Sequence, residues 1–406
     1  MDVNRMPASR YRWVLIIAAF VIMMIISIYQ YSWFLFAYAI HKQLNWDLAT
    51  VGLTFTVFAY TVTFVQPFSG YIADSYGPRK VAIAASFLVG FGFIMASQAS
   101  SPQVLYLFYG LGGLGVGVLY GISAACAIKW FPDKRGFATG LVVFGFGAGT
   151  AIFNLLIQGL LEAEGLRTTF MWTGIFMTIV LVPLSWLYRY PQEGWLPSSD
   201  GGNKPVRISP DFRPVEMVKT YQWPLMYFSF TVTVSIVLIF GAQMKMVAKE
   251  FNVPANYFSL LLVLFPLGNG LSRVVAGTVS DKIGREKTMM TFYSLLGVAI
   301  LCFVQFGQIP ILFMIIVFIA ALLGGAPFAL YPATIGDYYG SKYATTNYGI
   351  TYTAKSWAGL ISGWLSGYLV MQFGSYKLLL VLVALCSLLA AVLSTPPLMK
   401  APQKQL

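Results

Sequence analysis

Residues 70–80 of this chain read GYIADSYGPRK, and residues 277–287 read GTVSDKIGREK. Both stretches follow the pattern G-x-x-x-D-x-x-G and end in basic residues, and they start 207 residues apart in a chain of 406. Each copy also comes directly after an apolar segment. A motif that recurs at about half the chain length indicates two halves of related structure.

The composition is that of a membrane protein. Hydrophobic residues make up 58% of the chain, charged residues only 10%, and the mean hydropathy is +0.73, whereas a soluble domain carries about 25% charged residues. The net charge of +12 is better explained by basic cytoplasmic loops than by a nucleic-acid partner. Three cysteines within apolar segments and one histidine at a segment end predict no metal site, disulfide framework or cofactor.

Twelve apolar segments are long enough to cross a bilayer, which takes about 20 residues. They lie approximately at 13–40, 50–72, 81–99, 103–130, 137–161, 168–188, 224–247, 255–279, 288–306, 309–332, 346–373 and 377–398. The longest polar stretch, about 189–223, is too short for a core of its own. The sequence therefore predicts an all-α membrane protein. It has a six-helix half at 1–188, a cytoplasmic linker with an interfacial helix at 189–223, and a second six-helix half at 224–406.

The basic residues predict the orientation of these segments. With the N-terminus in the cytoplasm, nineteen Lys and Arg fall on the cytoplasmic side and five on the outer side. Cytoplasmic loops of membrane proteins are enriched in Lys and Arg. We therefore expect both chain ends in the cytoplasm.

In this orientation both copies of the repeated motif lie on the cytoplasmic side, and we expect them to form a gate. The glycines would allow close helix approach and a tight turn, and the aspartates would bond to a helix N-terminus or to basic residues of the other half. The alternative is an ordinary basic loop, which two copies at this spacing disfavour. The expected gate residues are Gly70, Asp74, Gly77, Arg79, Gly277, Asp281, Gly284 and Arg285.

Two cations interrupt apolar segments, while the other Lys and Arg lie at or near segment ends. Arg273 lies within LLVLFPLGNGLSRVVAGTVS (261–280) and Lys355 within NYGITYTAKSWAGLISGWLSG (347–367). A charge at this depth costs about 2.5–3.5 kcal/mol on insertion scales, and no Asp or Glu lies at mid-depth in any segment. The sequence therefore predicts an anionic substrate as the counter-ion. The structural alternatives are bonds from Arg273 to backbone carbonyls and snorkelling of Lys355 to an interface.

Other polar side chains are candidates to join these cations. Asn269 lies one turn before Arg273 on the same helix face, where it can orient the guanidinium or bind the substrate. Tyr120 and Tyr331 occupy corresponding places in the two halves, and Tyr31 lies in the first segment. Each hydroxyl could donate to a carboxylate, although tyrosines also form the aromatic belts of membrane interfaces. Alternating access would place the site near the bilayer midplane, between the halves.

Four segments resemble one branch of the major facilitator superfamily, which holds the monocarboxylate porters and the bacterial oxalate:formate antiporters. They are YQYSWFLFA (29–37), LYGISAACAIKWFPDKRGFATG (119–140), SDKIGREK (280–287) and NYGITYTAKS (347–356). The resemblance implies small organic anions as substrates, a bacterial inner-membrane location, and Arg273 as the arginine that binds carboxylate. Animal porters carry an Asp where this chain has Asn269. The antiporters carry the Arg and also a Lys, matched here by Lys355.

Two functions remain open at this point. The sequence favours a proton-coupled symporter of short monocarboxylates of the lactate and pyruvate class, with the proton carried on the substrate or bound near Lys355 and Arg273. The alternative is an antiporter of the oxalate:formate type, because two fixed cations match one dianion or two monoanions. A membrane-bound sensor or enzyme is disfavoured, since the chain shows no signalling domain and no catalytic cluster. Besides the anion, we expect protons and lipid as partners, and no obligate protein partner.

Overall fold

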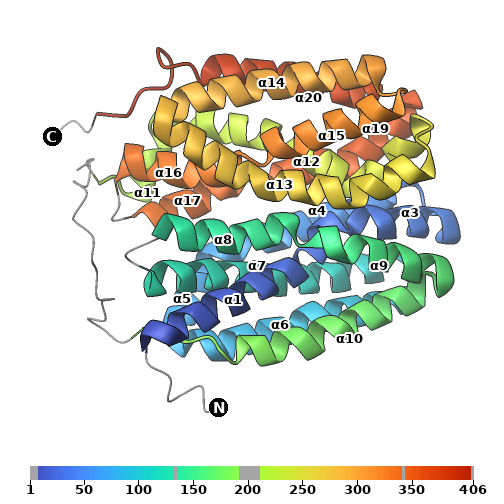
Figure 1. The fold of residues 1–406 in the computed structure, drawn as a ribbon, viewed down its shortest axis with the longest axis horizontal. Helices are drawn as coiled ribbons and strands as arrows, with labels where there is room; N and C mark the ends of the chain where they lie inside the picture. Colours follow the sequence, from blue (N-terminus) through green and yellow to red (C-terminus); the bar gives the residue numbers. More distant parts are fainter. Residues whose placement is uncertain (1–7, 132–134, 192–210, 341–342, 404–406) are drawn as a thin grey trace. The chain divides into compact units, whose positions relative to one another are not determined.

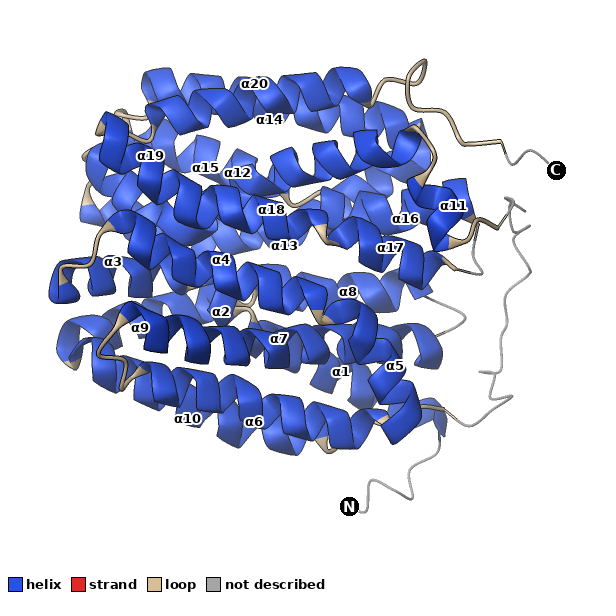
Figure 2. Cartoon of the chain, turned by 180° about the vertical axis from the view of Figure 1, so that it is seen from behind, coloured by secondary structure: helices blue, strands red, loops and turns tan. Residues whose placement is uncertain are grey.

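A computed structural model describes residues 8–131, 135–191, 211–340 and 343–403. All regular elements in these ranges are helices, as Figure 2 shows. Within the described residues, ten helices are long and apolar enough to cross a membrane, and a shorter apolar helix, Lys377–Leu393, covers most of the twelfth predicted segment. The eleventh predicted segment is also helical but is divided into shorter pieces. The all-α membrane fold predicted from the sequence is therefore confirmed.

The chain divides into two compact units. Unit 1 consists of Met1–Ser32 and Tyr60–Pro205, and unit 2 consists of Trp33–Ala59 and Val206–Leu406. The end of the first predicted span and the start of the second are thus grouped with unit 2. The domain boundaries expected from the sequence stay a prediction.

Unit 1 is a bundle of apolar helices (Figure 1). They are α1 (Ala8–Ile26), α2 (Ile28–Tyr31), α5 (Gln66–Tyr76), α6 (Pro78–Ala96), α7 (Pro102–Trp130), α8 (Arg135–Ala148), α9 (Thr150–Ala163), α10 (Gly165–Ser185) and the end of α4 (Leu48–Phe64). Tyr29 lies in the centre of this bundle, where its hydroxyl donates to the Val89 carbonyl at 2.6 Å. A Cβ at Gly112 would clash with the Tyr29 ring. Small residues of this kind let membrane helices approach closely.

The first predicted span is not one straight helix. It is interrupted at Ser27 and Ser32, which separate α1, α2 and the first helix of unit 2. The Ser27 hydroxyl donates to the Met24 carbonyl at 2.6 Å, and the Ser32 hydroxyl donates to Asn154 Oδ1 at 2.7 Å. Serine hydroxyls that bond to a carbonyl three or four residues back commonly bend helices.

Unit 2 is built around a long helix, α12, which is the most buried of the candidate spans. Its helices are α3 (Trp33–Leu44), most of α4, α11 (Pro214–Val218), α12 (Gln222–Glu250), α13 (Ala255–Ile283), α14 (Arg285–Phe306), α15 (Pro310–Gly324), α16 (Pro327–Tyr339), α17 (Ala344–Tyr352), α18 (Ala354–Leu360), the π-helix η2 (Ile361–Leu365), α19 (Ser366–Phe373) and α20 (Lys377–Leu393). The helix α11 lies in the predicted linker, and the preceding Phe212 N–H donates to the Tyr339 carbonyl at 2.9 Å. This end of the linker is therefore bonded to α16.

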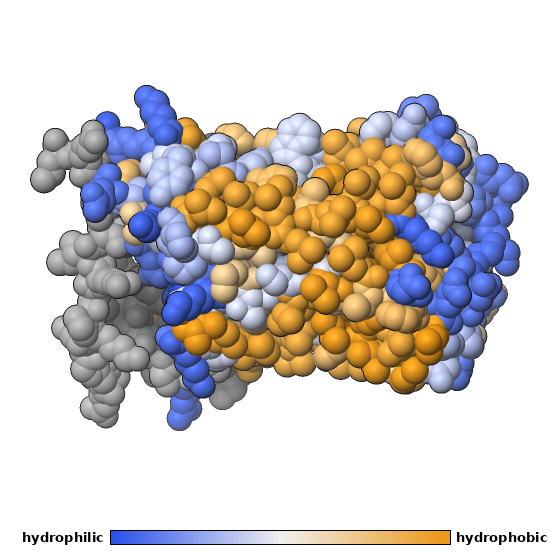
Figure 3. Space-filling view, turned by 90° about the horizontal axis from the view of Figure 1, so that it is seen from above, coloured by the Kyte–Doolittle hydropathy of each residue, from blue (hydrophilic) through white to orange (hydrophobic). Residues whose placement is uncertain are grey.

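The surface has the pattern expected of a protein solvated by lipid. Figure 3 shows apolar side chains over the middle of the visible face and hydrophilic side chains at its two ends. Large apolar side chains are exposed on helices of both units, including Ile17, Ile152, Ile179, Leu385 and Val392. Such exposure would be costly in water and is favourable in a bilayer.

Candidate substrate site

Arg273 lies on α13 and is buried, with 5% of its surface exposed. Its Nη1 donates to two oxygens of Asn269, the backbone carbonyl at 2.6 Å and Oδ1 at 2.9 Å. The helix itself creates this pair, because residues four apart lie on one face. The bond to the carbonyl is the structural alternative considered for Arg273, but it occupies only Nη1 of the guanidinium.

Two buried nitrogens of this pair have no hydrogen-bond partner among the described residues. They are Nε of Arg273 and Nδ2 of Asn269. Within the same described ranges, no Asp or Glu forms an ion pair with Arg273. A buried cation without a counter-ion and a buried donor without an acceptor both cost free energy. A carboxylate, which offers two oxygens to the guanidinium fork, would satisfy both.

Lys355 lies on α18 and is almost fully buried. Its Nζ donates to the Tyr352 hydroxyl at 3.2 Å and lies 5.4 Å from the centroid of that ring. The ammonium is therefore held inside the protein, against the last residue of the preceding helix α17. This position differs from that of a snorkelling lysine, whose ammonium stays in water.

One aromatic ring lies close to both cations. The centroid of the Phe328 ring is 5.3 Å from Arg273 Cζ and 6.0 Å from Lys355 Nζ. Cation–π attraction acts over such distances and contributes about 0.5–2 kcal/mol per contact. Phe328 therefore offsets part of the cost of burying two like charges. The sequence analysis missed Phe328. The available signal was its position three residues before Tyr331, on the same helix face.

Further aromatic rings surround Phe328. The Phe230 ring of α12 lies 5.8 Å from Phe328, 4.9 Å from Tyr331 and 6.0 Å from Tyr352, in each case edge-on. The structure thus brings together, within unit 2, four residues predicted from the sequence and three that were not predicted as site residues. We call this set the cationic cluster: Phe230, Asn269, Arg273, Phe328, Tyr331, Tyr352 and Lys355.

The other two predicted tyrosines meet in unit 1. Tyr31 and Tyr120 both contact the ring of Phe146 on α8, edge-on, at centroid distances of 5.7 Å and 5.2 Å. All three side chains are buried. We call Tyr31, Tyr120 and Phe146 the neutral cluster. Phe146 was not predicted from the sequence. Phe144, on the same helix, instead stacks on Phe20 at 6.5 Å.

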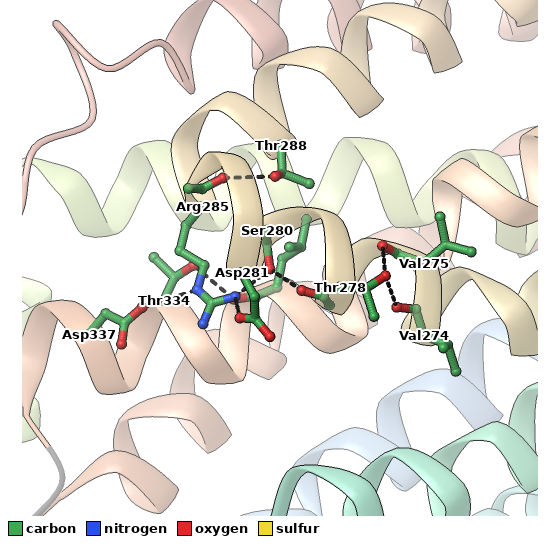
Figure 4. Close-up of polar contacts among 12 residues, drawn as sticks. Val274, Val275, Thr278, Ser280, Asp281, Arg285, Thr288, Thr334 and Asp337 are labelled. Carbon is green, nitrogen blue, oxygen red and sulfur yellow. Dashed lines mark hydrogen bonds and ion pairs between the residues drawn. The ribbon is translucent and has the colours of Figure 1, made fainter. Parts of the chain in front are cut away.

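The second copy of the repeated motif forms a polar cluster at the turn between α13 and α14 (Figure 4). Arg285 Nη1 lies 2.9 Å from Asp281 Oδ1, and its Nε lies 3.1 Å from Asp337 Oδ2 of α16. Arg285 also donates to the Ser280 hydroxyl. Asp281 therefore pairs with a residue of its own unit. Arg285 ties the α13–α14 turn to α16 through Asp337, a partner that sequence spacing did not indicate.

The motif glycines have distinct roles in this structure. Gly77 and Gly284 have φ angles of 84° and 94°, a region where residues with a Cβ are strained. At Gly277, an added Cβ would meet no described atom within 4 Å. The close helix approach expected at Gly277 is thus not seen in this conformation.

The first copy of the motif is only partly visible. The side chains at positions 70 and 74 lie outside the described residues. The Arg79 guanidinium carbon lies 5.8 Å from the centroid of the Trp186 ring. In the described part of the chain, no group of three or more His, Cys, Asp or Glu side chains could hold a metal ion.

The sequence of this chain is similar to those of known transporters. The family model of the Major Facilitator Superfamily matches residues 15–246 and 225–405. The oxalate:formate antiporter of Oxalobacter formigenes is 32% identical over 97% of this chain and 94% of its own length. The probable sulfoacetate transporter SauU of Cupriavidus necator is 24% identical over 84% of this chain and 83% of its own length. The 4-hydroxybenzoate transporter PcaK of Pseudomonas aeruginosa is 20% identical over 96% of this chain and 93% of its own length.

The apolar helical fold and these matches define an integral membrane transporter. The chain belongs to the Major Facilitator Superfamily. The resemblance to the oxalate:formate antiporter branch, predicted from four sequence segments, is also confirmed.

Proposed function

We propose that this transporter carries small carboxylates across the membrane in exchange for one another, as an antiporter of the oxalate:formate type. The observation that carries the proposal is the pair of buried cations, Arg273 and Lys355, within 6.0 Å of one aromatic ring. The apolar segments that contain them hold no Asp or Glu. An anionic substrate would therefore supply negative charge that these segments do not.

The two cations suit different parts of one substrate. The guanidinium of Arg273 is a rigid fork that matches the two oxygens of a carboxylate. The ammonium of Lys355 is a compact charge that binds any nearby oxygen. Together they would hold one dicarboxylate or two monocarboxylates, with Tyr331 as a further donor from α16.

The same charges give a physical reason for exchange. In alternating access, the two halves of such a transporter rock around a central site. Without substrate, this conformational change would have to occur with the positive charges of Arg273 and Lys355 buried and no anion bound beside them, which is costly. A bound anion lowers this cost, so the loaded protein changes conformation more readily than the empty one.

The aromatic rings favour a second candidate, the proton-coupled symport of a monocarboxylate with an apolar end. Phe230 and Phe328 would contact the methyl group of a substrate such as lactate or pyruvate. A single carboxylate leaves one cation without a partner, so a proton would have to travel with the substrate or leave the pair Arg273 and Lys355. The sequence alone favoured this candidate. The two cations at one ring and the 32% identity to an oxalate:formate antiporter lead us to place exchange first.

Transport by purified protein in liposomes distinguishes the two candidates. Radiolabelled oxalate and radiolabelled L-lactate are offered to vesicles that are either empty or loaded with formate, at acidic and at neutral external pH. Exchange predicts oxalate uptake only into loaded vesicles. Symport predicts lactate uptake into empty vesicles that is stimulated by external acid. Failure to transport either anion under all conditions would refute both candidates.

The remaining expectations belong to the same proposal. The excess of basic residues on one side supports cytoplasmic termini, and the similarity to a bacterial antiporter supports a bacterial inner-membrane location. We also propose that the protein is a transporter without enzymatic activity, that it works without an obligate protein partner, and that the two motif copies form its cytoplasmic gate.

A further inference from the structure

Lys355 lies on a short helix that is bounded by an irregularity at each end. The helix α18 spans only Ala354–Leu360. It is preceded by a break at Thr353 and followed by the π-helix η2. Breaks and π-helices in membrane spans leave backbone groups that other residues must satisfy. Those residues also determine where the short helix lies.

The break at Thr353 is held by α12. The Thr353 hydroxyl donates to the Ile350 carbonyl at 2.6 Å, which uses its only hydrogen. The Tyr227 hydroxyl lies 3.0 Å from the same Thr353 oxygen and is therefore the donor in that bond. One turn further along α12, the Thr231 hydroxyl lies 3.3 Å from the Ala354 carbonyl, a weaker contact.

The π-helix is held by α4, within the same unit. The Trp364 N–H donates to the Thr56 hydroxyl at 3.0 Å, and that hydroxyl donates to the Gly359 carbonyl at 3.2 Å. A Cβ at Gly363 would lie 2.5 Å from the Gly52 carbonyl oxygen, so glycine is required for this approach. Thr56 thus supplies both a donor and an acceptor to the widened turn.

We infer that Tyr227 is a positioning residue for Lys355: its bond to Thr353 sets the break, and the break sets where the Lys355 ammonium lies relative to Phe328. This inference rests on the proposed function, in which Lys355 binds a substrate carboxylate. Lys355 is two residues from Thr353, and its Nζ lies at the end of a long side chain. A small shift of the break therefore moves the ammonium away from its 6.0 Å position at Phe328.

The test is Tyr227→Phe, which removes the hydroxyl and keeps the ring. Oxalate and formate affinities are measured on purified protein by ligand-dependent thermal stabilisation and by exchange in liposomes. Positioning through Lys355 predicts a rise of about 3–10-fold in the KM for oxalate, since a misplaced ammonium loses only part of its hydrogen bond to the substrate. A single formate can bind to Arg273 alone, so the KM for formate and the maximal exchange rate should change less than about twofold.

Two further variants keep the test specific. Tyr109→Phe is the matched control, because the Tyr109 hydroxyl also bonds to another helix, at the Tyr29 carbonyl over 2.7 Å, but within unit 1 and away from Thr353 and Lys355. It should leave the ratio of oxalate to formate affinity unchanged. In a Lys355→Gln background, Tyr227→Phe should have no further effect on oxalate binding.

Hydrogen–deuterium exchange of the peptide around Thr353 provides a readout without substrate, and exchange there should be faster in Tyr227→Phe. Three results would each overturn the inference. They are an equal loss of affinity for oxalate and formate in Tyr227→Phe, a loss of oxalate affinity that persists in the Lys355→Gln background, and an unchanged rate of deuterium exchange around Thr353. If the wild-type protein binds neither anion, the proposed function fails. If it binds both and the Tyr227→Phe pattern is absent, only the positioning role fails.

Discussion

The neutral cluster of unit 1 and the cationic cluster of unit 2 are built from the same kind of aromatic contact. Tyr120 meets Phe146 edge-on at 5.2 Å, and Tyr331 meets Phe230 edge-on at 4.9 Å. The two tyrosines also come from corresponding spans of the two halves. The difference lies in the charges: the cationic cluster contains Arg273 and Lys355 beside its rings, whereas the members of the neutral cluster are all uncharged aromatic side chains.

Unit 1 does contain cation–π contacts, but at helix ends. The Arg189 guanidinium lies 3.6 Å from the Tyr11 ring centroid, and the Lys129 ammonium lies 3.5 Å from that of Tyr190. These residues are near the ends of their apolar segments, where water can solvate the charge. In unit 2, Arg273 and Lys355 are buried well inside theirs. If the cationic cluster binds the substrate as proposed, recognition of charge is concentrated in one of the two units.

The largest expected effect comes from removing a charge from the cationic cluster. Arg273→Ala should lower carboxylate transport by about 100-fold or more, because truncating one partner of a buried charge pair costs about 2–5 kcal/mol. Exchange in liposomes measures it. Arg189→Ala in unit 1 is the control and should retain most of the activity. Substantial transport by Arg273→Ala would show that another group binds the carboxylate.

A smaller effect separates the two cations. Lys355→Gln should raise the KM for a dicarboxylate by about tenfold or more, which corresponds to about 1.4 kcal/mol, and should affect a monocarboxylate less. The reason is that a second carboxylate loses its charged partner, while the first keeps Arg273. Lys245→Gln is a suitable control, since Lys245 also lies over aromatic rings, those of Tyr38 and Phe258, but outside the cationic cluster. Equal losses for both substrate types would contradict the division of roles.

A matched pair of aromatic substitutions sharpens the comparison directly. Phe328→Leu removes the ring that lies near both cations and should raise the KM by about 5–30-fold, given about 1–2 kcal/mol for the two cation–π contacts together. Phe146→Leu makes the same change in the neutral cluster and should raise the KM by less. Transport kinetics of both variants, corrected for the amount of folded protein, provide the measurement. A larger rise in KM for Phe146→Leu than for Phe328→Leu would contradict the prediction, because it would show that the neutral cluster of unit 1 contributes more to substrate binding.

The smallest effect lies outside both clusters, at the start of α4. Asp47 accepts bonds from the backbone N–H and the hydroxyl of Thr50. Partial burial raises the pKa of Asp47, but these bonds outweigh it and hold its pKa below the usual value. The charged carboxylate therefore stabilises the folded state above about pH 4, and this contribution is lost as the pH falls below that value.

Asp47→Ala should accordingly lower the free energy of unfolding by about 1 kcal/mol at neutral pH, as expected for the loss of a capping residue, and leave the KM unchanged. The difference in Tm between wild type and variant should narrow as the pH falls below about 4. A difference in Tm that is constant over this range would show that the carboxylate charge has no part in the effect.

Much of the fold follows from local features of the sequence. Apolar segments of about 20 residues predict spanning helices wherever they occur, and helices occupy all twelve predicted segments. Their interruptions were not predicted, because Ser27, Ser32 and Thr353 are compatible with a helix, and a break at each depends on bonds to other helices or to nearby carbonyls. The grouping of Trp33–Ala59 with unit 2 also has no local signal.

The candidate site divides in the same way. Arg273 and Lys355 could be found from the sequence because a charge in an apolar segment is costly and therefore conspicuous. Asn269 followed from its spacing to Arg273 along one helix. Phe328 had only its spacing to Tyr331 as a signal. Phe230 and Asp337 had none, because an aromatic residue is common in any span and an acidic residue is common at any span end. Their importance comes from contacts between helices.

The sequence by itself determined the membrane-embedded helical architecture, the family, and the two cations within apolar segments. These features depend on composition and on the spacing of residues within single helices. Both the free energy of transferring an apolar segment from water and the period of a helix are set by residues close together in the sequence. Only the tertiary structure decided that both cations share the Phe328 ring, that Arg285 reaches Asp337, and that α12 holds the break before Lys355. These contacts join residues far apart in the chain, and helix packing alone brings such residues together.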